Sequence, residues 1–393
     1  MFKMLIGTLL SSIHSNSLSF QPELIELLEI SDMIILIHSY EVGECGVTYP
    51  KKHRYRKGYF MEFNILNQSP VLEGHSVEES LGHTVELAKL ADSLGYKRYF
   101  VSEHHNMENL IGTAPEVLVT HLINHTKNIN IGAGGVMLSH HNPFHVAEQF
   151  QLISHLAPGR VNLGVGKAPG GTPLSTAALQ HELRPDIDSF NDRFLKLKSY
   201  IDGTHENSRS LKISVDTDSS KPEVFLLGGS LSSAEFAAEN GVNFIFAHFI
   251  KNDESLLKEV AAAYKSLNPD GRFITALTVL IAETEEDKKT AAEKNALYSL
   301  TFKDGKTLRV TTEKQVNDYI RNSNEKIDVE KTKLDMILGT RDEILTKLDT
   351  LADDSPIDEF MFHIPSLDPA LRNHTVETLA PIHTIHKEKA GIL

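Results

Sequence analysis

The chain has 393 residues, of which 40% are hydrophobic and 23% charged, an ordinary globular composition with enough apolar sequence for a full core. Its formal net charge of −14 at pH 7 argues against a nucleic-acid or anionic-membrane partner, because both bind clustered cations. No uninterrupted apolar run in the sequence is long enough to span a bilayer.

Residues 1–60 differ in composition from the rest of the chain. Their six Lys and Arg residues balance six Asp and Glu residues, so the whole net charge of −14 belongs to residues 61–393. We therefore expect 1–60 to be an N-terminal extension outside the folded domain, with Met61 as the natural start; an ordered helical arm is the alternative. The single cysteine, Cys45, excludes an internal disulfide and a cysteine-based metal cage, which favours a reducing, cytoplasmic environment.

From residue 63 onward, predicted strands alternate with predicted helices. The strands are expected at 63–67, 98–102, 129–133, 161–165, 224–227, 243–246, 273–281 and 359–363. The helices are expected at 76–94, from Pro115, and at 143–156, 187–201, 232–240, 253–267, 285–299, 341–351 and 370–384. The first helix also has a capping box, because Glu79 follows Ser76 by three residues.

Eight strands alternating with helices predict an α/β fold that closes as a (β/α)8 TIM barrel; an open, doubly wound sheet is the alternative. Residues 301–336 interrupt the rhythm with charged, weakly periodic sequence, which we interpret as a loop insertion late in the chain. In such a barrel the functional side chains lie at the carboxyl ends of the strands.

Glu103, His104 and His105 follow the second predicted strand. Adjacent side chains of an extended segment point to opposite faces, so at most one histidine can share a face with the glutamate, and a common metal site is disfavoured. A single histidine that acts as a general acid or base, or as a hydrogen-bond donor, is the simpler interpretation.

Three further histidines, His140, His141 and His145, crowd the segment after the third strand. They lack a partner set at zinc-like spacing, and no HExxH motif occurs in the chain. We expect at least two of the three to be surface loop residues, and we predict no metal site.

Two segments after later strands could bind an anion. Lys167 follows the fourth strand, where it could face a phosphate; a solvated lysine in a flexible loop is the alternative. The segment 228–234 opens a helix, where backbone N–H groups and hydroxyls bind anions; plain N-capping by Ser230 or Ser232 is the alternative. Considered together, the two segments favour phosphate. A dinucleotide fingerprint is excluded, because Gly170 comes one position late.

Four segments carry a family resemblance: residues 95–106, 131–138, 156–171 and 227–238. Together they resemble the bacterial luciferase-like, flavin-dependent monooxygenase family, over essentially all of 61–393. The resemblance implies a (β/α)8 barrel that binds reduced FMN as a co-substrate at the carboxyl ends of its strands. It also implies oxidation of a small organic substrate by O2 through a C4a-peroxyflavin.

The resemblance assigns a set of cofactor-binding positions. Gly134 and Gly135 match a short-residue pair whose strained, often cis, peptide lies under the flavin ring, and glycines suit such backbone. Lys167 stands where the family has a phosphate-binding arginine; it keeps the charge but lacks the bidentate fork. The implied cofactor-binding residues are Gly134, Gly135, Lys167, Gly229, Ser230 and Ser233.

His104 matches the catalytic histidine of the family, with His105 and Glu103 beside it as further candidate catalytic residues. The family also implies a small-molecule substrate, a separate flavin reductase and a homodimer. Some relatives use the deazaflavin F420 instead, and some bind flavin with little activity, so both remain alternatives. The loops expected to shape the substrate pocket are 168–186, 248–252 and 301–336.

Overall fold

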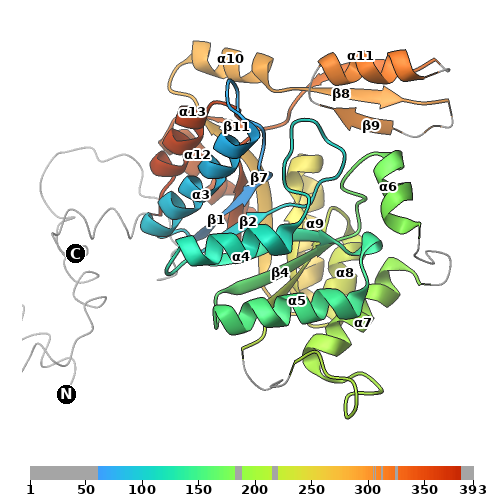
Figure 1. Ribbon diagram of the computed structural model, residues 1–393. Coiled ribbons are helices and arrows are strands. Elements are labelled where there is room, and N and C mark those ends of the chain that lie inside the picture. Colours follow the sequence, from blue (N-terminus) through green and yellow to red (C-terminus); the bar gives the residue numbers. More distant parts are fainter. Residues whose placement is uncertain are drawn as a thin grey trace, which may run out of the picture. The chain divides into compact units, whose positions relative to one another are not determined.

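Eight parallel strands form a closed barrel in the part of the chain that the computed structural model describes (Figure 1). The described residues are 61–181, 188–214, 220–303, 305, 307–310, 313–323 and 326–381. The barrel strands are β1 (Glu62–Asn67), β2 (Arg98–Val101), β3 (Asn130–Met137), β4 (Val161–Gly166), β5 (Glu223–Gly228), β6 (Asn243–Ala247), β7 (Phe273–Ile281) and β12 (Glu359–His363). They pair in this order, β12 pairs with β1, and the (β/α)8 prediction is confirmed at all eight strands.

Helices surround the barrel (Figure 1). Ser76 and Glu79 form the predicted capping box. Three helix predictions were wrong: α10 ends at Lys294, α13 ends at Thr378, and α6 occupies a segment expected to be loop. The helices around the barrel are α3 (Val77–Ser93), α4 (Pro115–His125), α5 (Pro143–Leu156), α6 (Pro173–Gln180), α7 (Phe190–Asp202), α8 (Leu231–Glu239), α9 (Glu254–Leu267), α10 (Glu285–Lys294), α12 (Arg341–Asp354) and α13 (Pro369–Thr378).

The late insertion is a folded unit rather than a loop, and it begins earlier than the sequence suggests. Its antiparallel strands have the order β10-β8-β9 and pack with α11 around a small apolar core. Its elements are β8 (Ala296–Thr301), β9 (Thr307–Val310), α11 (Glu313–Asn322) and β10 (Asp328–Lys333). Only a few side chains of β8, β9 and α11 are buried, so the apolar periodicity was too weak to reveal these elements. A further strand, β11 (Ile337–Gly339), pairs with the end of β7.

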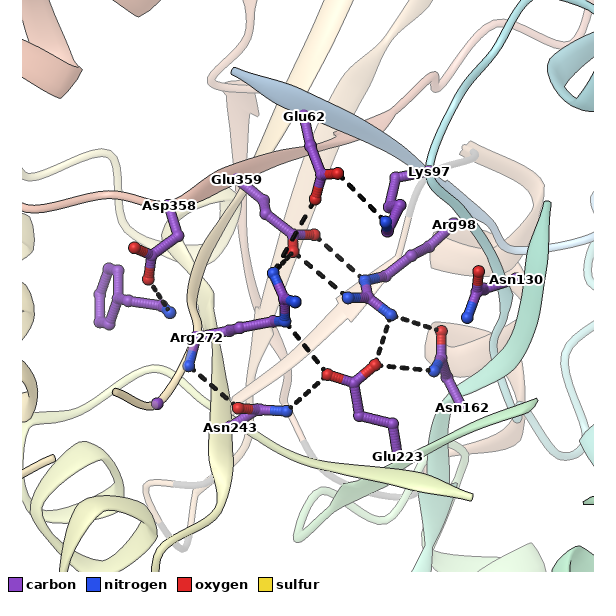
Figure 2. Close-up of polar contacts among 12 residues, drawn as sticks. Glu62, Lys97, Arg98, Asn130, Asn162, Glu223, Asn243, Arg272, Asp358 and Glu359 are labelled. Carbon is purple, nitrogen blue, oxygen red and sulfur yellow. Dashed lines mark hydrogen bonds and ion pairs between the residues drawn. The ribbon is translucent and has the colours of Figure 1, made fainter. Parts of the chain in front are cut away.

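A charged network with a buried centre, Arg98 and Glu359, lies at the amino end of the barrel (Figure 2). Arg98, which is 1% exposed, donates from Nε to Glu359 at 3.1 Å and from Nη1 to Glu223 at 2.7 Å. Arg272 contacts the same two carboxylates at 3.0 and 3.2 Å. Burial alone would raise the pKa of Glu359, but the charge and hydrogen bonds of Arg98 lower it below the usual value. The network therefore closes this end with charges that balance.

Above this network, apolar side chains fill the barrel interior, so it is a packed core rather than a pore. The interior cluster is Leu66, Phe100, Phe225, Ile245, Ile274, Ala276 and Met361. The carboxyl ends of the strands are thus the end of the barrel where chemistry-bearing side chains collect.

The chain divides into two units, Met1–His53 and Arg54–Leu393, and all described residues belong to the second. The predicted extension 1–60 lies outside the described residues. Among the helices that are described, none combines the length and apolarity needed to cross a membrane.

Candidate active site

Glu103 joins two loops at the carboxyl end of the barrel. Its carboxylate is fully buried and accepts hydrogen bonds from His105 Nε2 at 2.7 Å, His141 Nε2 at 2.8 Å and the Met137 backbone N–H at 2.8 Å. Burial would raise the pKa of Glu103, but the bonds from His141, His105 and Met137 lower it. Both carboxylate oxygens are engaged, so Glu103 holds the rings of His105 and His141 and the Met137 backbone in place.

His141, in the segment after β3, is the residue that Glu103 binds across the two loops. Burial works against a proton on His141, but its hydrogen bond to Glu103 and the carboxylate charge raise its pKa above the ordinary value. This contact fixes the segment after β3 to the segment after β2. The His105 ring also lies edge-on to the His140 ring, with centroids 5.9 Å apart.

His104 points away from this junction. Its Nδ1 lies 3.1 Å from Ser102 Oγ, its backbone N–H donates to Gly112 O at 2.7 Å, and no described residue hydrogen-bonds its Nε2. Burial lowers the pKa of His104 to about 4, so the ring is neutral at pH 7. Only His105 shares the face of Glu103, which confirms that at most one of the two histidines could. His104 therefore keeps one ring nitrogen for a ligand.

Gly134 and Gly135, in the carboxyl half of β3, form a part of the site that has no side chains. Their peptide bond is cis, as the resemblance implies, and the pairing of β3 with β4 shifts register here. A Cβ on Gly134 would lie 2.8 Å from Phe100 Cβ, and one on Gly135 would lie 2.8 Å from Gly164 O. Any larger residue would collide, so bare backbone remains, which suits the close approach of a planar ring.

Lys167 follows β4, and α8 follows β5. These two strands are paired up to Gly166 and Leu227, so Lys167 and the start of α8 lie at the ends of neighbouring strands. Lys167 is exposed and forms no ion pair with any described residue. Ser230 N-caps α8, because its Oγ accepts from Ser233 N–H at 3.3 Å. Its Oγ also lies 2.8 Å from Ser233 Oγ, and the space around Gly229 is open. A cation, hydroxyls and a helix N-terminus therefore line one edge, which can hold a phosphate.

The prediction for the loop histidines was wrong. His141 binds Glu103, and His140 is buried with Nε2 2.7 Å from Pro169 O and Nδ1 3.1 Å from Gln180 Nε2. Only His145 lies on the surface. No local pattern could show that His141 meets a carboxylate 38 residues earlier in the chain. The described residues contain no group of three or more His, Cys, Asp or Glu side chains that could hold a metal ion.

Residues 61–356 match the family model described as luciferase-like monooxygenase. N-acetyl-S-alkylcysteine monooxygenase of Bacillus subtilis (strain 168) is 38% identical over 312 residues, which cover 78% of this chain and 93% of that protein. The crystal structure of apo-MsnO8 superposes with a TM-score of 0.66 at 27% identity, over 83% of this chain and 98% of that one.

A further solved structure with this fold is the oxygenating constituent of 3,6-diketocamphane monooxygenase from Pseudomonas putida in complex with FMN. It has a TM-score of 0.58 and 16% identity, and the match covers 82% of this chain and 97% of that one. The family match covers most of the barrel, and the first relative is matched over nearly its full length. The chain therefore belongs to the luciferase-like monooxygenase family of flavin-dependent enzymes.

Proposed function

We propose that this protein binds reduced FMN at the carboxyl ends of its barrel strands and uses O2 to oxidise a small organic substrate. The observation that carries this proposal is the alignment of three features around one barrel end. These are the side-chain-free backbone at Gly134–Gly135, the anion-binding edge at Lys167 and Ser230, and the neutral ring of His104. Reduced FMN, when bound, supplies the electrons that activate O2.

The chain's own residues have separate tasks in this proposal. Lys167, Gly229, Ser230 and Ser233 hold the phosphate, and Gly134–Gly135 supports the ring. His104 Nε2 holds or moves a proton beside the substrate. Glu103 and His105 keep the segment that carries His104 in place.

We further propose a thioether as the substrate class, which rests on the relative named N-acetyl-S-alkylcysteine monooxygenase and its 38% identity.

A separate reductase would supply the reduced flavin, and a cytoplasmic homodimer would be the working form. Residues 61–393 would form the barrel domain, and 1–60 would be dispensable. If a protein of residues 61–393 alone failed to bind FMN, residues 1–60 would not be dispensable.

The test begins with the equilibrium binding of FMN, reduced FMN and F420. The complex with reduced FMN is then mixed with 18O2 and a panel of S-alkylated N-acetylcysteines, alkanes and aldehydes. Incorporation of one 18O atom into an organic product supports the proposal. Tight binding of F420 without binding of FMN would favour an F420-dependent oxidoreductase instead, and FMN binding with no product from any substrate would favour a flavin-binding protein with little activity.

Lys167→Ala is expected to weaken FMN binding by about tenfold, the lower end of what a charge-assisted hydrogen bond contributes, because Lys167 is exposed to solvent. Riboflavin, which lacks the phosphate, should bind the variant and the parent protein equally. Lys167→Arg is the matched control and should keep FMN affinity, because it retains the charge. Fluorescence titration of both flavins gives the result, and equal losses for the two would remove Lys167 from the phosphate site.

A further inference from the structure

His363 ends β12 at the same face of the barrel as His104. β12 pairs with β1, and β1 pairs with β2, so a single strand separates the two strands that deliver these histidines. His363 lies beyond residues 61–356, the stretch that the family model matches. None of the motifs identified from the sequence includes it.

The two histidines have the same hydrogen-bonding pattern. His363 Nδ1 lies 3.3 Å from Thr278 Oγ1, as His104 Nδ1 lies 3.1 Å from Ser102 Oγ. No described residue hydrogen-bonds Nε2 of either ring, and both rings are half-buried, so a small molecule can reach them. Buried His140 differs from both, because each of its ring nitrogens is engaged.

The surroundings of His363 keep its ring neutral. Burial, together with the positive charge of Arg372, lowers the pKa of His363 to about 3, and protonation of His104 would lower it further. Arg372 is itself 3% exposed and donates to Ile364 O at 2.6 Å and to Asn67 Oδ1 at 2.9 Å. No described carboxylate pairs with Arg372, so no nearby negative charge offsets its positive charge.

The remaining neighbour of His363 is apolar. The Phe249 ring, in the turn after β6, has its centroid 5.9 Å from that of His363. When the Thr278 hydroxyl donates to Nδ1, the neutral ring carries its proton on Nε2. His363 is then a hydrogen-bond donor beside an aromatic wall.

We propose that His363 is a second histidine of the reaction site and that its Nε2–H donates a hydrogen bond to an acceptor atom of the substrate, beside the proton-handling His104. This assignment rests on the proposed function. It predicts a substrate with a carbonyl or carboxylate oxygen near the atom that is oxidised, because a neutral N–H donor in a partly apolar site selects such a group.

The test replaces His363 in two ways. The amide of Asn can reach the position of Nδ1 but not of Nε2, whereas Gln places its amide near Nε2. In the intact protein, His363→Asn is expected to lower kcat/KM for an S-alkylated N-acetylcysteine, the thioether probe used above, by about tenfold or more, the usual cost of one lost hydrogen bond to a ligand. His363→Gln should recover part of the loss, and neither variant should change FMN affinity. Equal kcat/KM for the parent protein and both variants would overturn the proposal.

A readout that needs no turnover is labelling by diethyl pyrocarbonate, mapped by peptide mass spectrometry. His104 and His363 should both be modified at pH 6, and saturating substrate should protect both, while buried His140 should remain unmodified. An unmodified His363, or one that substrate leaves unprotected while it protects His104, would overturn the assignment. Failure of the parent protein to bind FMN or form product would instead count against the proposed function, and labelling without ligand would still report whether His363 is accessible.

Discussion

Arg98→Met is expected to destabilise the barrel by about 3–5 kcal/mol, the usual cost of removing one partner of a buried ion pair. Arg98 and Glu359 are each 1% exposed, so the variant would leave the Glu359 carboxylate buried with only part of its compensation (Figure 2). Urea unfolding monitored by circular dichroism gives the free energy of unfolding.

Lys97→Met is the matched control for Arg98→Met. Lys97 is the preceding residue, and it pairs with Glu62 at 3.1 Å, but the two side chains are 39% and 37% exposed. A surface pair of this kind contributes about 0–1 kcal/mol, so the control should unfold near the parent midpoint. If Arg98→Met and Lys97→Met lowered the free energy of unfolding by the same small amount, the charged network at the amino end would not stabilise the barrel.

The loss caused by Arg98→Met should depend on pH. Arg98 holds the pKa of Glu359 below its ordinary value, so its stabilisation is complete above that ordinary value and disappears as pH falls through the lowered one. The difference in unfolding free energy between parent and variant should therefore be largest near pH 7 and shrink as pH falls through the lowered pKa of Glu359, below which the carboxyl group is protonated in both. A difference that is constant with pH would mean that lost packing, not lost charge pairing, is the cause.

His104→Ala is expected to lower kcat by about 10²–10⁴-fold, the range for loss of a general acid or base, while FMN affinity stays within severalfold. The reason is geometric: Ser102 holds Nδ1, and Nε2 is left for the reacting partners. Stopped-flow turnover and flavin titration separate the two quantities. A collapse of flavin binding instead would make His104 a structural residue.

The pH profile provides a second check on His104. Burial lowers its pKa to about 4, so the neutral ring is fully populated above pH 5 and is lost only as pH falls through 4. If turnover requires neutral His104, titration of this residue should not change kcat between pH 5 and 8. An inflection near pH 6.5 that vanishes in His104→Gln would show that its pKa is not depressed.

The residues that stabilise the barrel and the residues of the candidate active site lie at opposite ends of the barrel. The Arg98 network holds the amino ends of the strands, whereas His104, Lys167 and the Gly134–Gly135 peptide lie toward the carboxyl ends. Variants at one end can therefore change unfolding without changing turnover, and the reverse, which makes the predictions above independent of one another.

Sequence reasoning succeeded where the information is local. Each barrel strand is a short apolar run bounded by polar or glycine-containing turns, so all eight could be located before the structure was known. Helix starts carried their own signals, as at Ser76. The insertion was mistaken for a loop, because β8, β9 and α11 bury only a few apolar side chains, which form a small core of their own.

The sequence by itself determined the barrel, the family and the opposed directions of His104 and His105, because strand periodicity and motif spacing act over a few residues. Only the tertiary structure decided that Glu103 binds His141, that Arg98 lies between two carboxylates, and that His363 reaches the face of His104. These contacts join residues dozens to hundreds of positions apart. Barrel closure and strand register set them, and no local pattern encodes either.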